Sequence, residues 1–187
     1  MDKDFLNKYL LDFSELMRPD DLILDQLIEI KEALIDASSK GNKGLIFGNG
    51  GSAAIASHFS VDLTKNASVR CLNFNESDLI TCFANDYGFK NWVAKAIEFY
   101  GDQGDVLIVI SSSGKSQNMI NATTSARKKK FSKIVTLSGF KEGNLLRQSG
   151  DINLWVNSKA YNFVENLHQI WLLAIVDLII GDKEYSA

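Results

Sequence analysis

Short apolar runs alternate with amphipathic stretches along most of this 187-residue chain. Unbroken apolar runs predict strands near residues 44–48, 69–73, 105–110, 133–137 and 152–156. Apolar residues recur at helical spacing over residues 52–64, 77–83, 90–99, 116–129 and 161–180. Apolar strands separated by helices are typical of a parallel sheet that is covered on both faces. The pattern therefore predicts an α/β fold with a parallel five-stranded sheet, formed by one domain over residues 1–187.

Two more helices are predicted ahead of the first strand. The first carries apolar residues at helical spacing as far as Met17 and is expected to end at Pro19. Asp20 can cap the second helix, which ends near Gly41. An α/β unit ordinarily starts with a strand. We therefore expect this helical pair, residues 1–40, to pack on the domain or on a neighbouring subunit.

Composition narrows the classes of partner. The chain has 20 Lys and Arg against 23 Asp and Glu, so no overall field attracts nucleic acid or an anionic membrane surface. The basic run at 127–130 falls at a predicted helix end, where cations are favourable. Cys71 and Cys82 are too few for a disulfide scaffold and are not spaced as metal ligands, which favours a reducing compartment. We expect both side chains to be buried in the core. The N-terminal residues show no leader pattern, and no apolar window of membrane-spanning length is expected, since the run Ile170 to Ile180 is short and contains Asp177. Both observations favour a cytoplasmic protein.

Two turns carry the candidate chemistry. Gly48-Asn49-Gly50-Gly51-Ser52 follows a predicted strand and opens a helix, and Ser111-Ser112-Ser113-Gly114-Lys115-Ser116 repeats this arrangement. Glycines allow close approach of a ligand to the backbone, while the first turn of a helix favours an anion. Neither turn matches a dinucleotide fingerprint or a Walker A loop. The two turns predict one phosphorylated ligand held between them, with Lys115 as an additional charge.

With Asn85-Asp86-Tyr87-Gly88 as a third segment, and with His58 after the first turn, the sequence resembles the sugar isomerase (SIS) domain family. Within it, the chain is most similar to the phosphoheptose isomerases. The resemblance implies a three-layer fold with a flavodoxin-like parallel sheet, and a homotetramer with active sites between subunits. It implies that the serine turn binds the sugar phosphate, the glycine turn contacts the substrate through its backbone, and the third segment contacts the polyol. The expected substrate-binding residues are Asn49, Gly50, Gly51, Ser52, Asp62, Asn85, Asp86, Ser111, Ser112, Ser113 and Ser116.

The resemblance also raises the question of zinc. Phosphoheptose isomerases carry a His and a Glu on the helix after the first turn, and a Gln-Glu pair with a further His on the last helix. Here His58 is present, but Asp62 stands at the position of that Glu, Val164 at that of the Gln and Leu172 at that of the second His. Zinc ordinarily takes three or four protein ligands. We therefore expect no cofactor, with zinc as the alternative.

Aldose–ketose isomerisation requires a base that moves a proton between neighbouring carbons through an enediol. Glu165, which the family pattern retains, is the predicted base, and His168 three residues later is the predicted partner. The alternatives are that Glu165 complements a helix N-terminus and that His168 is a packed core residue. His58 is the third catalytic candidate, and the alternative for it is a subunit contact. The predicted function is a phosphosugar isomerase similar to sedoheptulose 7-phosphate isomerase, acting in surface-sugar synthesis. The alternative is a non-catalytic SIS module that binds a phosphosugar or a protein, like the family's DnaA-associating homologue.

Overall fold

The computed structural model describes residues 1–18 and 20–185 and contains each predicted strand and helix. Pro19, predicted to end the first helix, lies outside the described residues. In chain order the elements are α1 (Asp2–Leu16), α2 (Asp21–Ser39), β1 (Gly44–Phe47), α3 (Gly51–Lys65), β2 (Cys71–Leu72), α4 (Ser77–Tyr87), α5 (Trp92–Tyr100), β3 (Val106–Ser111), α6 (Gln117–Lys128), β4 (Lys133–Ser138), β5 (Ile152–Trp155) and α7 (Tyr161–Ile180).

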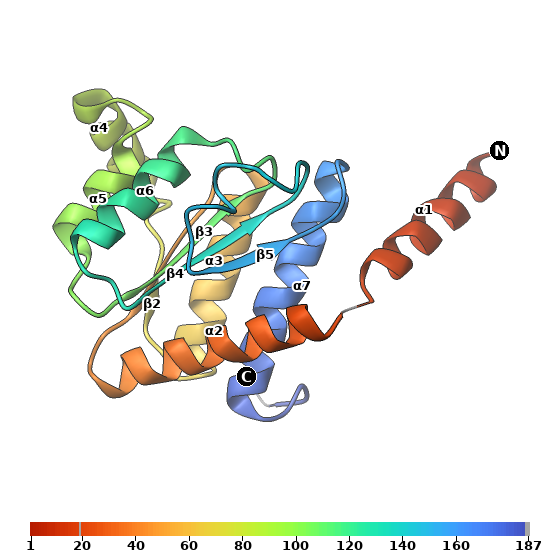
Figure 1. Ribbon diagram of the computed structural model, residues 1–187, viewed down its shortest axis with the longest axis horizontal. Helices are drawn as coiled ribbons and strands as arrows, with labels where there is room; N and C mark the ends of the chain where they lie inside the picture. The colour runs from red at the N-terminus through yellow and green to blue at the C-terminus, as the bar shows by residue number, and fades with distance from the viewer. Residues whose placement is uncertain (19, 186–187) are drawn as a thin grey trace.

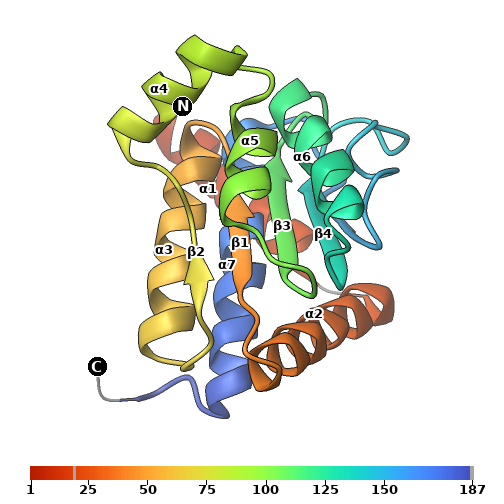
Figure 2. The ribbon, with the colours of Figure 1, turned by 90° about the vertical axis from the view of Figure 1, so that its left-hand side faces the viewer.

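The strands form one parallel sheet in the order β2-β1-β3-β4-β5. Helices α2, α3 and α7 cover one face, and α5 and α6 cover the other (Figures 1 and 2). A separate apolar cluster fills the space on each side of the sheet. Strand β3 is buried along its whole length because both of its faces are covered. The predicted α/β fold and its flavodoxin-like strand order are confirmed.

The two N-terminal helices differ in their packing. Helix α2 buries Ile30, Leu34 and Ala37 in the cluster that it shares with α3 and α7. Helix α1 has no buried residue and extends away from the body of the protein (Figure 1). Its aromatic rings meet α7 at Phe163, whose ring centroid lies 4.6 Å from that of Tyr9. The apolar face of α1 is thus largely exposed.

Helix α7 corrects one expectation. Its 20 residues are long and apolar enough to cross a membrane by length and composition, whereas the sequence pattern predicted no such window. The helix begins at Tyr161 and so adds apolar residues ahead of Ile170. Core packing accounts for part of this composition, since Leu167, Leu172 and Ile175 are buried against the sheet and its neighbouring helices, whereas Ile170 and Leu178 are exposed.

The expectation that both cysteines are buried is correct for Cys71 and wrong for Cys82. Cys71 lies in strand β2 beneath α3, and burial raises the pKa of its thiol well above the ordinary value. Cys82 lies on α4, a helix with no buried residue, and its side chain faces solvent. Cys82 was expected to be buried as a small apolar side chain, but α4 sits at the rim of the molecule (Figure 2).

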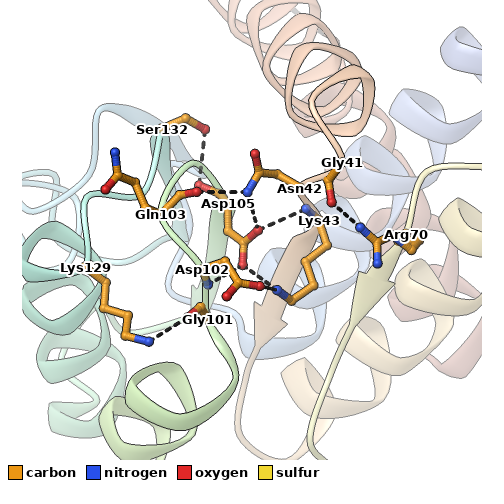
Figure 3. Close-up of polar contacts among 10 residues, drawn as sticks. All are labelled: Gly41, Asn42, Lys43, Arg70, Gly101, Asp102, Gln103, Asp105, Lys129 and Ser132. Carbon is orange, nitrogen blue, oxygen red and sulfur yellow. Dashed lines mark hydrogen bonds and ion pairs between the residues drawn. The ribbon is translucent and has the colours of Figure 1, made fainter.

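A buried ion pair ties the amino ends of β1 and β3 together (Figure 3). The ammonium of Lys43 lies 2.8 Å from the carboxylate of Asp105 and 2.6 Å from that of Asp102. Asp105 is fully buried and also accepts hydrogen bonds from the backbone N–H groups of Lys43 and Asp102. Burial lowers the pKa of Lys43, but the two carboxylates outweigh it and raise this pKa overall. This pair holds the end of the sheet opposite the carboxyl ends of the strands.

Candidate active site

Both candidate turns lie at the carboxyl ends of adjacent strands. Strand β1 pairs in parallel with β3, and the glycine turn follows β1 while the serine turn follows β3. The helix after β1 covers one face of the sheet, and the helix after β3 covers the other. In open parallel sheets, ligands bind between two strands whose helices diverge in this way. Gly50 and Gly114 have φ values of 55° and 66°, a conformation that favours glycine and lets each turn bend sharply into a helix.

The two turns share one cavity of about 150 Å³. Its polar walls come from the glycine turn, the serine turn and the first residues of α7. The lining residues are Asn49, Ser52, Ile110, Ser111, Ser112, Ser113, Ser116, Tyr161 and Glu165. The sequence therefore placed the turns correctly as neighbours, and the predicted base lies in the same cavity.

The cavity favours an anion without any basic side chain among its described lining residues. Helices α3, α6 and α7 begin at this cavity, and none of the three has a side-chain cap among the residues that the structure describes. By contrast, Asp20 caps α2. Uncapped N-terminal N–H groups and the positive ends of three helix dipoles attract a phosphate. Lys115 is exposed and is not among the residues that line the cavity.

Side-chain hydrogen bonds fix the shape of both turns. The hydroxyl of Ser111 donates to that of Ser116 over 2.9 Å and spans the serine turn. The amides of Asn49 and Asn118 exchange two hydrogen bonds of 3.1 and 2.9 Å, which join the glycine turn to α6. Asn118 is buried, and this pair links the glycine turn to the helix that follows the serine turn.

Glu165 is half-buried one turn into α7 and points into the cavity. Its Oε1 accepts a hydrogen bond of 3.4 Å from the hydroxyl of Ser112. Its carboxylate also lies directly against Gly51, where a Cβ atom would overlap Oε2. The carboxylate is therefore held between the two turns.

His168 lies behind the cavity and not in it. The side chain is fully buried, and its Nε2 lies 3.1 Å from the carbonyl oxygen of Ser138 at the end of β4. Burial lowers the pKa of His168 to about 4, so the ring is neutral at physiological pH. Its Nδ1 is buried without a partner among the described residues. Glu165 contacts the hydroxyl of Ser112, and His168 contacts the backbone of Ser138, so the structure shows no hydrogen bond between them among the described residues. The acid–base pair of the two stays a prediction.

The remaining predicted residues are spread more widely. His58 and Asp62 lie further along α3, with Nε2 of His58 3.2 Å from Oδ2 of Asp62. Asn85 and Asp86 are exposed at the end of α4 and bond to each other over 2.9 Å. None of these four lines the described cavity of this single chain.

The residues present do not fit a protein-held zinc ion. Among residues 1–18 and 20–185 there is no group of three or more His, Cys, Asp or Glu that could hold a metal. Val164 and Leu172 are fully buried apolar side chains and supply no ligand atom. His58 and Asp62 alone fall short of the usual three or four ligands.

Comparison with known proteins agrees with this geometry. The sequence profile of the SIS domain matches residues 20–139, which is more than half of the chain. This chain belongs to the SIS domain family. A phosphoheptose isomerase of Fusobacterium nucleatum is 32% identical over 80% of this chain and 78% of its own, and one of Proteus mirabilis is 32% identical over 88% of each. The structure of phosphoheptose isomerase GmhA from Neisseria gonorrhoeae matches with a TM-score of 0.88 at 24% identity, covering 96% of this chain and 99% of that one, and so supports the fold.

Three residues of this SIS domain site were missed in the sequence. Tyr161 lines the cavity, Asn118 holds the glycine turn, and Gln169 contacts His58. Tyr161 opens a helix that starts at the ligand edge, and Asn118 follows the serine turn directly, so both positions carried a local signal. Gln169 lies one turn after Glu165 on the same polar face of α7, so this position also carried a local signal, but the contact of that face with α3 depends on packing.

Proposed function

We propose that this protein interconverts the aldose and ketose forms of a phosphorylated sugar. Sedoheptulose 7-phosphate is the first substrate to test, and heptose biosynthesis is the proposed context. The observation that carries the proposal is the carboxylate of Glu165 in the same cavity as two anion-binding turns. A phosphate between these turns would place the adjoining carbon chain beside a group that can accept a proton.

In the proposed reaction the serine turn and the three helix N-termini hold the phosphate. Glu165 removes the proton from the carbon beside the carbonyl, and the electron pair forms the double bond of an enediol. The carbonyl oxygen gains a proton and the neighbouring hydroxyl loses one. Glu165 then returns its proton to the former carbonyl carbon, which completes the exchange of aldose and ketose. We assign His58 to the reacting end and His168 to support of the serine turn through Ser138.

We also propose that residues 1–187 form one domain that assembles as a cytoplasmic homotetramer. The exposed apolar residues of α1, among them Phe5 and Leu10 at 67% and 64% exposure, support an interface with another subunit. Asn85 and Asp86 would then reach the polyol of a substrate bound between subunits. No nucleic acid or membrane partner is part of this proposal.

A panel of sugar phosphates, read by NMR for product and for exchange of substrate hydrogen with deuterated solvent, tests the activity. Glu165→Gln keeps the shape of the side chain and removes the base, so turnover should fall by roughly 10²–10⁴-fold while phosphosugar binding remains. Normal turnover in this variant would refute the assignment of Glu165.

A second candidate function is a non-catalytic module that binds a phosphosugar or a protein. The observation that favours it is the burial of apolar Val164 and Leu172 where the family pattern expects polar groups. In that case sugar phosphates would raise the melting temperature of the wild-type protein with no hydrogen exchange and no product.

A further inference from the structure

The side chain of Asn144, in the loop between β4 and β5, packs against the serine turn. It is buried and is not among the residues that line the described cavity. Gly114 of the serine turn has a φ of 66°, and a Cβ atom added to it would overlap Oδ1 and Cγ of Asn144 and lie 2.7 Å from its Cβ. The asparagine therefore occupies the space where any other residue at position 114 would place its side chain.

Four hydrogen bonds fix the orientation of the Asn144 amide. Its Nδ2 donates to Oγ of Ser138 over 3.0 Å, and to the carbonyl oxygens of Gly139 and Lys141 over 3.3 and 2.9 Å. Its Oδ1 accepts from the backbone N–H of Arg147 over 2.9 Å. A carbonyl oxygen only accepts and a backbone N–H only donates, so an amide turned by half a circle would lose the bonds to Gly139, Lys141 and Arg147. The partners thus determine which end of the amide is nitrogen and which is oxygen.

The same loop also bonds to the backbone of the serine turn at two points. The N–H of Gly139 donates to the carbonyl oxygen of Ser112 over 2.9 Å. The N–H of Leu146, a fully buried residue, donates to the carbonyl oxygen of Gly114 over 3.1 Å. Both bonds depend on the path of the chain over residues 139–146. The side chain of Asn144 bonds to the backbone near both ends of this segment, so we expect its loss to free the segment from the turn.

We infer that Asn144 is a positioning residue, which holds the serine turn in the conformation that binds the phosphate of the sugar. This role rests on the proposed function, in which that turn holds the phosphate. Ser112, Ser113 and Ser116 line the cavity, so a shift of the turn changes the distances from their polar groups to a bound phosphate. Asn144 lies outside the cavity lining, so its loss should weaken phosphate binding more than it slows proton transfer at Glu165.

Asn144→Ala removes the amide and allows three measurements. In the free protein, hydrogen exchange at the backbone N–H groups of Gly139 and Leu146 should become faster by roughly 10-fold or more. In titrations with inorganic phosphate, followed by the NMR signal of Gly114, the Kd should rise by roughly 10-fold, as expected for one or two weakened hydrogen bonds to the anion. In turnover of the best sugar phosphate, KM should rise by a similar factor while kcat changes by less than about 3-fold.

Asn153→Ala is the matched control. Nδ2 of Asn153 donates to the carbonyl oxygen of Gly150 over 3.1 Å, and its Oδ1 accepts from the hydroxyl of Thr136 over 2.7 Å. This asparagine also fixes a loop and lies against a glycine, but neither partner belongs to the serine turn. Asn153→Ala should lower the melting temperature, and it should leave the exchange of the two loop amides, the phosphate Kd and KM unchanged.

A double-variant cycle isolates the contact with Gly114. Gly114→Ala adds a methyl group that overlaps Asn144, and the positive φ adds a strain that is the same whatever residue stands at 144. Asn144→Gly removes the three atoms nearest to that methyl group, including Cβ. Gly114→Ala should therefore raise the phosphate Kd by roughly 10-fold in the wild type and by much less in Asn144→Gly. Equal increases in the two backgrounds, or a Gly114→Ala protein with the wild-type Kd, would overturn the inference.

The outcomes separate this inference from the proposed function. Unchanged hydrogen exchange in Asn144→Ala, or faster exchange with a wild-type phosphate Kd, would overturn the inference alone. Weaker phosphate binding by Asn144→Ala, in a protein that turns over no sugar phosphate, would support the inference and refute the isomerase activity. Signals of the serine turn in the wild type that do not respond to phosphate would overturn both.

Discussion

Gly51 offers the sharpest test of how the carboxylate of Glu165 is positioned. A Cβ atom at this residue would overlap Oε2 of Glu165 and would lie 3.0 Å from Cδ and 3.3 Å from Oε1. The backbone at Gly51 does not require glycine, because its φ is not positive. Gly51→Ala therefore changes one thing, the room available to the carboxylate.

Gly51→Ala should lower the activity but leave the stability unchanged or slightly raised. Ordinary contact between carbon atoms needs about 3.5–4.0 Å, so the carboxylate must retreat by roughly half an ångström to 1 Å. A displacement of about 1 Å can cost about 10²-fold in rate, or about 3 kcal/mol in the activation barrier. The flexible side chain of Glu165 moves at little cost, and alanine in place of glycine favours α3 by up to about 1 kcal/mol. Gly51→Ala should thus melt at or above the wild-type temperature while losing about 99% of kcat.

Steady-state kinetics on the best sugar phosphate, together with thermal melts at one protein concentration, measure both effects. Gly143→Ala is the control, since the nearest atom to its added Cβ is Nε2 of Gln148 at 3.7 Å and its φ is not positive. That variant should retain normal kinetics. A folded Gly51→Ala protein with wild-type kcat would refute the view that contact with α3 sets the position of the base.

Two further predictions concern stability. Asp105→Ala removes the buried partner of Lys43 and the acceptor of two backbone N–H groups, so the free energy of unfolding in urea should fall by about 3–5 kcal/mol. Asp102→Ala, at an exposed carboxylate, should lower it far less. Equal losses for the two variants would contradict the importance of the buried ion pair. For His168 the folded pKa of about 4 lies below the ordinary 6.5, so the unfolded chain binds the proton first and stability falls as pH drops through this window. His168→Gln keeps a hydrogen-bond donor for the carbonyl of Ser138 but has no titrating group. Between pH 6.5 and pH 4 the free energy of unfolding of the wild type should fall by about 3 kcal/mol more than that of this variant. Parallel curves of unfolding free energy against pH for the two proteins would refute the burial of a neutral ring.

The sequence alone determined the elements and the chemistry of the two turns. Strand runs of unbroken apolar residues, glycines at sharp bends and hydroxyls before a helix are local signals that act over a few residues. They were enough to predict a parallel sheet and to place an anion site at its carboxyl edge. The start of the last helix at that same edge also followed, because it comes directly after a parallel strand.

Only the tertiary structure decided which faces meet. Helix α7 is nearly wholly apolar only after Ile170, and its polar residues at 162, 165, 166 and 169 share one face. That this face meets α3, while His168 turns into the core, was decided by packing. The exposure of Cys82 likewise depends on what covers α4, and no local pattern records that. The rotation of each helix about its axis and the contacts between distant segments are set by the packing of the whole core. A local sequence pattern does not record this packing.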